Sequence, residues 1–363
     1  MKILTVIGAR PQFIKAATVS RVIAANEAIE EVLLHTGQHY DSNMSAIFFE
    51  ELDIPQPKYN LGISGTGHGE QTGKMLVRIE EVLLTEKPDF VVVYGDTNST
   101  LAGALAAVKL HIPLAHVEAG LRSFNRKMPE EINRILTDHS AEILFVPTDT
   151  AFKNLESEGI DEQKIMNVGD VMLDATIHYI AKAEKTRSIL SDLNLAPKSF
   201  VLVTIHRAEN TDDSKKLKKI FDSLENLTKE HRLLLPLHPR TLKGLTSINF
   251  ALGNSDIQFI DPVGYLDMLI LEKNAKMIIT DSGGVQKEAY FHRVPCITMR
   301  EETEWTELVE NGCNFLARPE NLSKVYNRAR SVEFSTSKNM YGDGDAALKI
   351  VNTLESYFKK ITI

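Results

Sequence analysis

Short apolar runs rich in β-branched residues alternate along the chain with longer segments of helical period. This alternation is typical of β–α units, in which successive strands pair in parallel and the connecting helices cover the sheet. The helical period is clearest after Gly67, where apolar residues recur on one stripe from Met75 to Leu83. The chain is therefore predicted to be an α/β protein with mainly parallel sheets.

The predicted strands fall into two sets. The first set comprises 3–7, 32–35, 90–94, 114–117 and 143–147, and the second comprises 200–204, 233–237, 257–260, 277–280 and 296–299. In a chain of 363 residues, two sets predict two Rossmann-like domains that face each other across a cleft. We expect residues 1–170 to form the first domain and residues 171–344 the second. A C-terminal amphipathic helix at 345–363 is expected to complete the first domain, with an apolar stripe of Leu348, Val351, Leu354 and Phe358.

The composition argues against two kinds of partner. A net charge of -8 disfavours nucleic acid. No stretch approaches the roughly 18 apolar residues that a membrane helix needs. The apolar run near the N-terminus is interrupted by Arg10 and Pro11, unlike a signal peptide. We therefore expect a cytoplasmic protein without a membrane or nucleic-acid partner.

Two familiar phosphate-binding motifs are incomplete. The near-match to a Walker loop at Gly73 and Lys74 has His68 where the first glycine belongs and Met75 where Ser or Thr binds magnesium. The first strand is followed by G-A-R-P-Q instead of G-x-G-x-x-G. A P-loop NTPase and a nicotinamide enzyme are both disfavoured, and no cofactor is expected.

A zinc site is also disfavoured. His35 and His39 are four residues apart, but Gly37 interrupts any helix between them and no third ligand is apparent. Cys296 and Cys313 lack the spacing of metal ligands. We expect no metal.

Three acids occupy positions where open parallel sheets build active sites. Asp96 and Glu118 each follow a predicted strand closely, and Glu130 follows Pro129 at the first turn of a predicted helix. Because ligands bind at the carboxyl ends of parallel strands, these acids suggest proton chemistry.

The second predicted domain carries a candidate diphosphate site. Ser282, Gly283 and Gly284 open a helix directly after a strand, where backbone N–H groups and the helix dipole favour an anion. Glu288 lies one turn later on the same helical face, and its carboxylate can accept two ribose hydroxyls. A tight strand-to-helix turn with a solvated Glu288 accounts for the same spacing.

Several cationic and aromatic residues are further candidates. Arg10 in the first strand-to-helix turn and Lys15 in the next helix can hold phosphate, although a surface pair explains them too. His206 follows the first strand of the second domain and can donate to a phosphate or take a proton, or be a satisfied structural group. Trp305 and His238 are candidate pocket walls, and packing explains them equally well.

Taken together, these motifs resemble the non-hydrolysing UDP-N-acetylglucosamine 2-epimerases, a family with the two-domain glycosyltransferase-B fold. The resemblance covers nearly the whole chain. It comprises G-A-R-P-Q-F-I-K, H-T-G-Q-H-Y-D, Y-G-D-T-N-S-T, H-V-E-A-G-L-R-S, P-E-E-I-N-R, T-I-H-R-A-E-N, T-D-S-G-G-V-Q-K-E-A and Y-G-D-G-D-A.

The resemblance implies a role for each matching residue. The first domain would hold the sugar and the second UDP. The catalytic positions would be Asp96, Glu118, Glu130 and His206. The UDP-binding positions would be Arg10, Lys15, His206, Arg207, Ser282, Gly283, Gly284 and Glu288. The resemblance also implies a homodimer that makes a nucleotide sugar for cell-envelope polysaccharide.

The family reaction inverts C2 of UDP-N-acetylglucosamine to give UDP-N-acetylmannosamine, by anti elimination of UDP to a 2-acetamidoglucal and re-addition. The C2 hydrogen is weakly acidic, so stabilisation of the leaving diphosphate matters, and each face of C2 needs its own proton carrier. We assign these carriers to Asp96 and to Glu118 or Glu130 without ordering them, and the leaving diphosphate to His206.

The chain departs from the commonest members of that family. It has A-R-P-Q where many have T-R-P-E, H-Y-D after G-Q, and E-T-E-W where many have an Arg-Pro pair. These variants look more like the branch that epimerises UDP-2,3-diacetamido-2,3-dideoxyglucuronate. The rival functions are a glycosyltransferase on the same fold, a hydrolysing epimerase and a catalytically idle UDP-sugar sensor.

Overall fold

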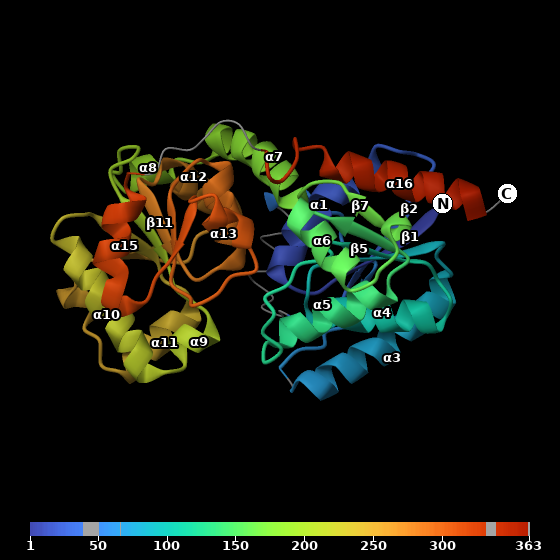
Figure 1. The fold of residues 1–363 in the computed structure, drawn as a ribbon, viewed down its shortest axis with the longest axis horizontal. Helices are drawn as coiled ribbons and strands as arrows, with labels where there is room; N and C mark the ends of the chain where they lie inside the picture. Colours follow the sequence, from blue (N-terminus) through green and yellow to red (C-terminus); the bar gives the residue numbers. More distant parts are fainter. Residues whose placement is uncertain (39–50, 66, 332–338, 362–363) are drawn as a thin grey trace. The chain divides into compact units, whose positions relative to one another are not determined.

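The computed structural model describes residues 1–38, 51–65, 67–331 and 339–361. The chain forms two compact units, which are Met1–Ile177 with Asn339–Ile363, and His178–Lys338. Each unit is a parallel sheet with helices on both faces, so the predicted α/β class is confirmed (Figure 1).

The sheet of the first unit has seven parallel strands in the order β3-β2-β1-β4-β5-β6-β7. The strands are β1 (Lys2–Ile7), β2 (Glu30–His35), β3 (Tyr59–Asn60), β4 (Phe90–Tyr94), β5 (Leu114–Val117), β6 (Ile143–Val146) and β7 (Ile165–Asn167). The helices are α1 (Arg10–Ala24), α3 (His68–Glu86), α4 (Asn98–Lys109), α5 (Pro129–Ser140), α6 (Asp149–Ser157), α7 (Val171–Thr186), which runs on into the second unit, and α16 (Ala346–Ile361). Helices α3, α4 and α5 pack side by side on one face, and α1 packs with α16 on the other (Figure 1).

The C-terminal helix corrects one detail of the predicted stripe. Ile350, Val351 and Leu354 are buried against the first unit, but the side chain of Leu348 is 51% exposed. The buried face of α16 therefore runs through Ala347 and Ile350 and leaves Leu348 at the surface.

The sheet of the second unit has six parallel strands in the order β10-β9-β8-β11-β12-β13. The strands are β8 (Val201–Thr204), β9 (Leu233–Pro236), β10 (Gln258–Ile260), β11 (Met277–Thr280), β12 (Cys296–Thr298) and β13 (Asn314–Leu316). The helices are α8 (Ile189–Asp192), α9 (Ala208–Thr211), α10 (Ser214–Thr228), α11 (Pro239–Ser247), α12 (Tyr265–Asn274), α13 (Gly283–Phe291), α14 (Thr306–Glu310) and α15 (Leu322–Ala329).

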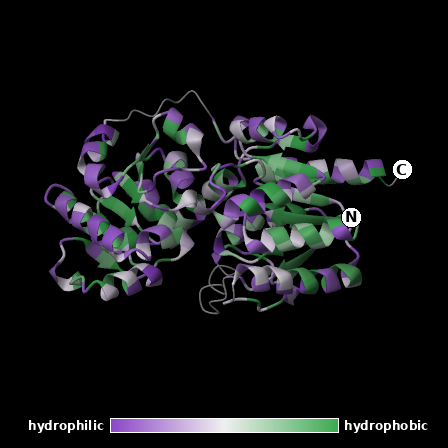
Figure 2. Cartoon of the chain, turned by 60° about the horizontal axis from the view of Figure 1, so that its bottom comes forward, coloured by the Kyte–Doolittle hydropathy of each residue, from purple (hydrophilic) through white to green (hydrophobic). Residues whose placement is uncertain are grey.

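The strands are apolar on both faces because helices cover both (Figure 2). In β8, Val201 and Val203 pack into the core beneath α10, whereas Leu202 packs into the opposite core with α12 and α13. This two-residue alternation of partners is what a strand buried on both sides requires.

All the predicted strands are present, with ends displaced by at most two residues. The sequence missed β3, β7 and β13, each of which has two or three residues and lies at an edge of its sheet.

Strand order places the candidate residues at corresponding points of the two units. The order reverses direction between β1 and β4 in the first unit and between β8 and β11 in the second. At such a switch point the loops leave in opposite directions and make room for a ligand at the carboxyl ends of the strands. Asp96 follows β4, and His206 and Ser282 follow β8 and β11.

Candidate active site in two parts

The turn after β1 is attached to the end of β4 by Gln12. Its Oε1 accepts hydrogen bonds from the N–H groups of Gly8 (2.8 Å) and Ala9 (3.0 Å), and its Nε2 donates to the carbonyl of Tyr94 (2.8 Å). This turn carries Arg10, the half-exposed first residue of α1. Gln12 therefore fixes the candidate cation relative to the strand that carries Asp96.

Asp96 is paired with a cation that the sequence analysis did not identify. Its Oδ2 accepts a hydrogen bond from Arg134 Nη2 at 2.6 Å, and its side chain is 29% exposed. Arg134 is buried and also donates to Glu131 at 2.9 Å. The bond from the guanidinium orients the carboxylate of Asp96, and the side chain stays partly accessible.

Glu118 forms a buried ion pair with Lys15, so two of the predicted residues are in direct contact. Lys15 was interpreted as a phosphate ligand, but in this structure its ammonium group is paired with the carboxylate. Glu118 has a φ of 71°, in the left-handed region that non-glycine residues rarely adopt. Such strain is typical of positions that the surrounding structure holds for function.

Adjacent acids at the start of α5 have different surroundings. Glu131 is buried, and its carboxylate accepts hydrogen bonds from the N–H groups of Ser123 (2.9 Å) and Phe124 (2.9 Å). Burial would raise the pKa of Glu131, but the bonds from Ser123 and Arg134 outweigh it and hold the pKa below its ordinary value. Glu130 is half-exposed and makes no hydrogen bond or ion pair within the described ranges. Of these two adjacent acids, only Glu130 is therefore available to a ligand.

A buried polar network under these acids was missed by the sequence analysis. His116 in β5 is completely buried, with Nδ1 2.7 Å from Asp138 Oδ1 and Nε2 2.7 Å from the Gly95 carbonyl oxygen. Arg122 Nη1 donates to Asp138 Oδ2 at 2.7 Å. The available signal was a histidine inside an otherwise apolar strand, because such a residue needs buried partners.

In the second unit, one buried carboxylate organises the ends of β8 and β11. Asp281 has no exposed surface and accepts hydrogen bonds from the N–H groups of His206 and Arg207 and from Asn210 Nδ2, each at 3.0 Å. Asn210 also donates to the carbonyl of Met299 at 3.0 Å. These bonds fix the backbone from which the candidate residues His206 and Arg207 project.

The His206 side chain is 36% exposed, and its Nδ1 is 3.6 Å from Asp281 Oδ1. Its ring lies 5.3 Å from the ring of His238, centroid to centroid. His238 caps α11, because its Nδ1 accepts from the N–H of Arg240 at 3.1 Å. Asp281 thus anchors the backbone of His206, and the His206 ring stays partly exposed.

The start of α13 has the geometry expected of an anion site. Ser282 is the N-cap residue, and its hydroxyl makes no capping bond to the helix. A Cβ at Gly283 would lie 2.5 Å from Glu304 Oε1, so a larger residue there would displace the Glu304 carboxylate. A Cβ at Gly284 would lie 3.9 Å from Glu288 Oε2, which confirms that these two residues share a face.

Trp305 is buried and contributes packing instead of an open pocket wall. Its exposed fraction is 3%, and Lys287 Nζ lies 4.1 Å from the centre of its ring. The neighbouring Glu304 accepts from Arg300 Nη1 at 3.0 Å and lies 3.8 Å from Arg207 Nη2. Trp305 therefore belongs to the support beneath α13.

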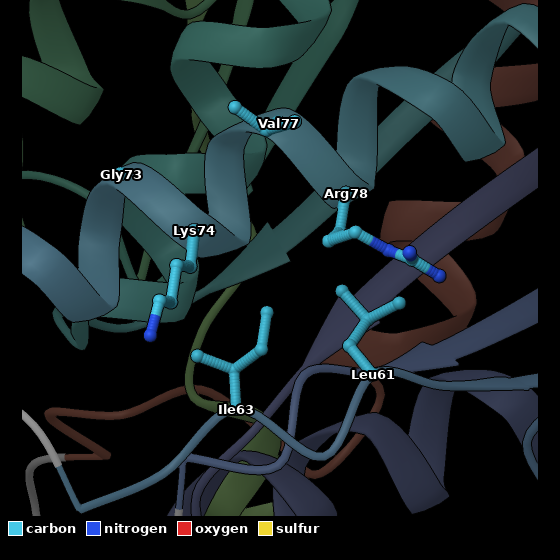
Figure 3. Close-up of a pocket in the computed structure, with 6 residues that line it drawn as sticks. All are labelled: Leu61, Ile63, Gly73, Lys74, Val77 and Arg78. Atoms are coloured by element: carbon cyan, nitrogen blue, oxygen red, sulfur yellow. The ribbon is translucent and has the colours of Figure 1, made fainter.

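A hollow of about 540 Å³ lies elsewhere in the first unit, between the segment before residue 65 and α3 (Figure 3). It is lined by Leu61, Ile63, Gly73, Lys74, Val77 and Arg78. None of the candidate site residues lines it. Gly73 and Lys74 lie within α3, which confirms that they do not form a phosphate loop.

The described ranges contain no group of three or more His, Cys, Asp or Glu side chains that could hold a metal ion. His39, one of the two histidines considered for zinc, lies outside them. No helix in those ranges has both the length and the apolar character to cross a membrane.

Comparison with known proteins shows what this chain is similar to. The family described as UDP-N-acetylglucosamine 2-epimerase matches residues 21–355. A UDP-2,3-diacetamido-2,3-dideoxy-D-glucuronate 2-epimerase of Pseudomonas aeruginosa is 51% identical over 98% of this chain and 99% of its own length. A UDP-N-acetylglucosamine 2-epimerase homolog of Methanococcus maripaludis is 52% identical over 98% of this chain and 100% of its own length.

A solved structure is also similar to this chain over nearly its whole length. The Methanocaldococcus jannaschii UDP-GlcNAc 2-epimerase in complex with UDP-GlcNAc and UDP superposes with a TM-score of 0.92 at 48% identity, over 98% of this chain and 100% of that one. The match to the family, over residues 21–355, covers most of both units. The chain therefore belongs to the UDP-N-acetylglucosamine 2-epimerase family.

Proposed function

We propose that this chain interconverts UDP-N-acetylglucosamine and UDP-N-acetylmannosamine by inverting C2 of the sugar without net hydrolysis. The observation that carries the proposal is the set of cation-paired acids at the ends of β4 and β5, namely Asp96 with Arg134 and Glu118 with Lys15. The relative from M. jannaschii, whose structure holds UDP-GlcNAc and UDP, supports this choice of substrate.

The proposed reaction needs two proton carriers on opposite faces of C2. One carboxylate removes the C2 proton, the electrons of that C–H bond form the C1–C2 double bond, and UDP leaves with the electrons of the C1–O bond. A second group then protonates C2 from the other face while UDP adds back to C1. Asp96 is one carrier, and Glu118 or Glu130 is the other. The ion pairs hold the carboxylates of Asp96 and Glu118 in fixed positions, as proton transfer at a defined carbon requires.

UDP is assigned to the second unit, and Arg10 and Lys15 of the first unit stay candidate phosphate ligands. The N–H groups of Gly283 and Gly284 at the start of α13 can bind the diphosphate, and Glu288 can bind the ribose hydroxyls. His206 and Arg207, on the backbone that Asp281 holds, stabilise the negative charge as UDP departs.

The test is an NMR assay of the wild-type protein with UDP-GlcNAc in deuterated water. We expect UDP-ManNAc to appear with deuterium at C2 of both sugars, because the proton is exchanged with solvent during inversion. Absence of C2 exchange would rule out the mechanism. Free sugar with UDP would instead indicate a hydrolysing epimerase, and turnover only with an added acceptor would indicate a glycosyltransferase. Binding of UDP-sugar without any turnover would indicate a sensor.

A second substrate is supported by a specific similarity. The P. aeruginosa relative, at 51% identity, is named for UDP-2,3-diacetamido-2,3-dideoxy-D-glucuronate, and E-T-E-W replaces the common Arg-Pro pair in this chain. The same assay with that uronate decides between the two. A kcat/KM at least tenfold higher for the uronate would assign the chain to that branch.

We also propose that the protein is a cytoplasmic homodimer that supplies a nucleotide sugar for cell-envelope polysaccharide. Support for self-association comes from exposed apolar side chains on α3 and α5, the two helices that flank α4, namely Val77, Leu84, Ile132 and Leu136. Analytical ultracentrifugation of the wild type and of Leu136→Glu tests this. A dimer that dissociates in the variant is the expected result, and a wild-type monomer would refute it.

A further inference from the structure

Each carbonyl group of the turn that carries Asp96 is held by a side chain from another element. The donors are Gln12 Nε2 to Tyr94 (2.8 Å), His116 Nε2 to Gly95 (2.7 Å) and Asn133 Nδ2 to Asp96 (2.9 Å). Turn carbonyls near a protein surface are ordinarily satisfied by water or by backbone. Their capture by three buried side chains indicates that the orientation of this turn matters.

The middle donor, His116, has a defined protonation state because of its two partners. The Gly95 carbonyl oxygen can only accept, so Nε2 must carry a proton. Nδ1 faces Asp138, whose other oxygen already accepts from Arg122 (2.7 Å) and from the N–H of Gly120 (3.2 Å). An aspartate with those donors is ionised, so Nδ1 also donates.

The environment of Asp138 supports this assignment. Burial would raise the pKa of Asp138, but the hydrogen bonds and charges of His116 and Arg122 outweigh it and leave the pKa below its ordinary value. The buried set therefore contains an anionic Asp138 between two cations. Arg122 is in turn paired with Glu158 through its Nε and Nη2 atoms at 2.7 and 2.8 Å. The charges of the four groups then sum to zero, which makes their burial tolerable.

We propose that His116 is a positioning residue of the active site: a buried imidazolium, held between Asp138 and the Gly95 carbonyl, that fixes the peptide from which Asp96 projects. This inference rests on the proposed function of Asp96. His116 itself has no exposed surface and touches no substrate in this scheme.

The geometry explains why the hydrogen bond from His116 to the Gly95 carbonyl can determine the position of Asp96. A peptide group is planar and trans, so fixing the Gly95 carbonyl also fixes the N–H and Cα of Asp96. Gly95 has a φ of 61°, and a Cβ there would lie 3.2 Å from Lys15 Nζ and 3.4 Å from Glu118 Oε2. The same peptide therefore adjoins both acids, and a shift of about 1 Å is expected to cost on the order of 100-fold in rate.

The first test reads the charge of His116 directly. Protein labelled with ¹⁵N in its histidine rings is studied by NMR near pH 8, and the His116 signals are identified by their loss in His116→Gln. We expect both ring nitrogens to carry protons, because Nε2 faces the Gly95 carbonyl oxygen and Nδ1 faces the Asp138 carboxylate. A neutral ring, with one bare nitrogen facing a protonated Asp138, would overturn the proposal.

The second test separates the two hydrogen bonds of His116. The amide of His116→Gln can reach the position of Nε2 and donate to Gly95, whereas the shorter His116→Asn can reach only the position of Nδ1 and contact Asp138. We expect His116→Asn to lower kcat about 100-fold and His116→Gln to lower it less than about 10-fold, each with KM within about threefold of the wild type. The exposed His111→Asn is the control.

If both His116 variants lost the same factor in kcat, and their unfolding temperatures fell by correspondingly similar amounts, His116 would have only a structural role. If His116→Asn does not fold, a loss of 100-fold in a folded His116→Gln would still refute the proposal, and retained turnover would support it. The proposed function and the proposed role of His116 can also be refuted independently of each other. A wild type inactive on every UDP-sugar would refute the proposed function, while the NMR spectrum would still decide whether His116 is a cation.

Discussion

In the first unit the polar groups at the strand ends are mainly side chains paired with one another, whereas in the second they are backbone N–H groups gathered on one buried carboxylate. Asp96 and Glu118 each have a cationic partner, Arg134 and Lys15. Asp281 instead accepts from the N–H groups of His206 and Arg207 and lies beside a helix start.

The difference follows from what each region is proposed to do. Proton transfer requires groups that change charge, so the acids must be titratable and accurately placed. Binding a diphosphate requires fixed positive ends of dipoles, which backbone N–H groups supply at no cost in reorganisation. Substitutions at the first region should therefore affect turnover most, and substitutions at the second should affect UDP affinity most.

The largest expected effect is that of Asp96→Asn. The variant keeps a side chain of the same shape next to Arg134 but removes the base, so kcat should fall by about 10²–10⁴-fold. UDP affinity, measured by calorimetry, should change less than about threefold. Asp149→Asn is the control, because Asp149 is an exposed acid that follows β6 at the same edge of the sheet. Unchanged turnover in Asp96→Asn would refute its role.

The buried ion pair between Lys15 and Glu118 provides a second test of the first unit. Lys15→Met leaves Glu118 buried without its cation, and the free energy of unfolding should fall by about 3–5 kcal/mol. The double variant Lys15→Met, Glu118→Gln should recover much of that stability but no activity. Denaturant titration measures both.

Lys74→Met is the matched control, because Lys74 pairs with Glu70 on the exposed face of α3 and should contribute less than about 0.5 kcal/mol. Equal losses in Lys15→Met and Lys74→Met would mean that the Lys15–Glu118 pair is effectively solvated. The proposed contrast between the two units would then lose its basis.

Asp281→Asn tests the second unit. The amide keeps one acceptor oxygen but loses the charge that the N–H groups of His206 and Arg207 face, so UDP affinity should fall by about 10- to 100-fold. At saturating substrate, kcat should fall far less than in Asp96→Asn. The exposed Asp256→Asn is the control. A loss of kcat with unchanged UDP affinity would reverse the assignment of the two regions.

The sequence predicted the positions of the site better than its pairings. Strand ends follow from local patterns, so Asp96, Glu118 and Ser282 could be assigned to strand ends from their neighbours alone. The partners could not, because Gln12 bonds to a residue 82 positions away and His116 to one 22 positions away. A polar residue in a pattern shows that a partner must exist, but not which one the fold supplies.

Lys15 is a second residue whose partner could not be predicted from the sequence. Its place in the first helix predicted a cation that could hold phosphate or form a surface pair, and in the structure its side chain is buried. Its carboxylate partner lies 103 positions further along the chain, after β5. Only the adjacency of β1, β4 and β5 brings the two together, so a ligand role and an ion-pair role were indistinguishable in sequence.

The smallest expected effect concerns the adjacent acids Glu130 and Glu131. Glu131→Gln should lower the free energy of unfolding at neutral pH by about 1–2 kcal/mol, because the bonds from Ser123 and Arg134 lose a charged acceptor. The pKa of Glu131 is lower in the folded state than its ordinary value of 4.5. Its stabilisation is therefore complete above about that pH and is lost as the pH falls through the folded-state pKa.

The difference in unfolding free energy between wild type and Glu131→Gln should accordingly be constant near neutrality and shrink below about pH 4.5, as measured by urea titration at several pH values. Glu130→Gln, one residue away and half-exposed, should leave stability unchanged within about 0.5 kcal/mol and reduce turnover. If Glu130→Gln destabilised the fold while Glu131→Gln impaired only turnover, the two acids would have exchanged roles. Glu130 would then be the acid that stabilises the first unit, and Glu131 the acid that is available to a ligand.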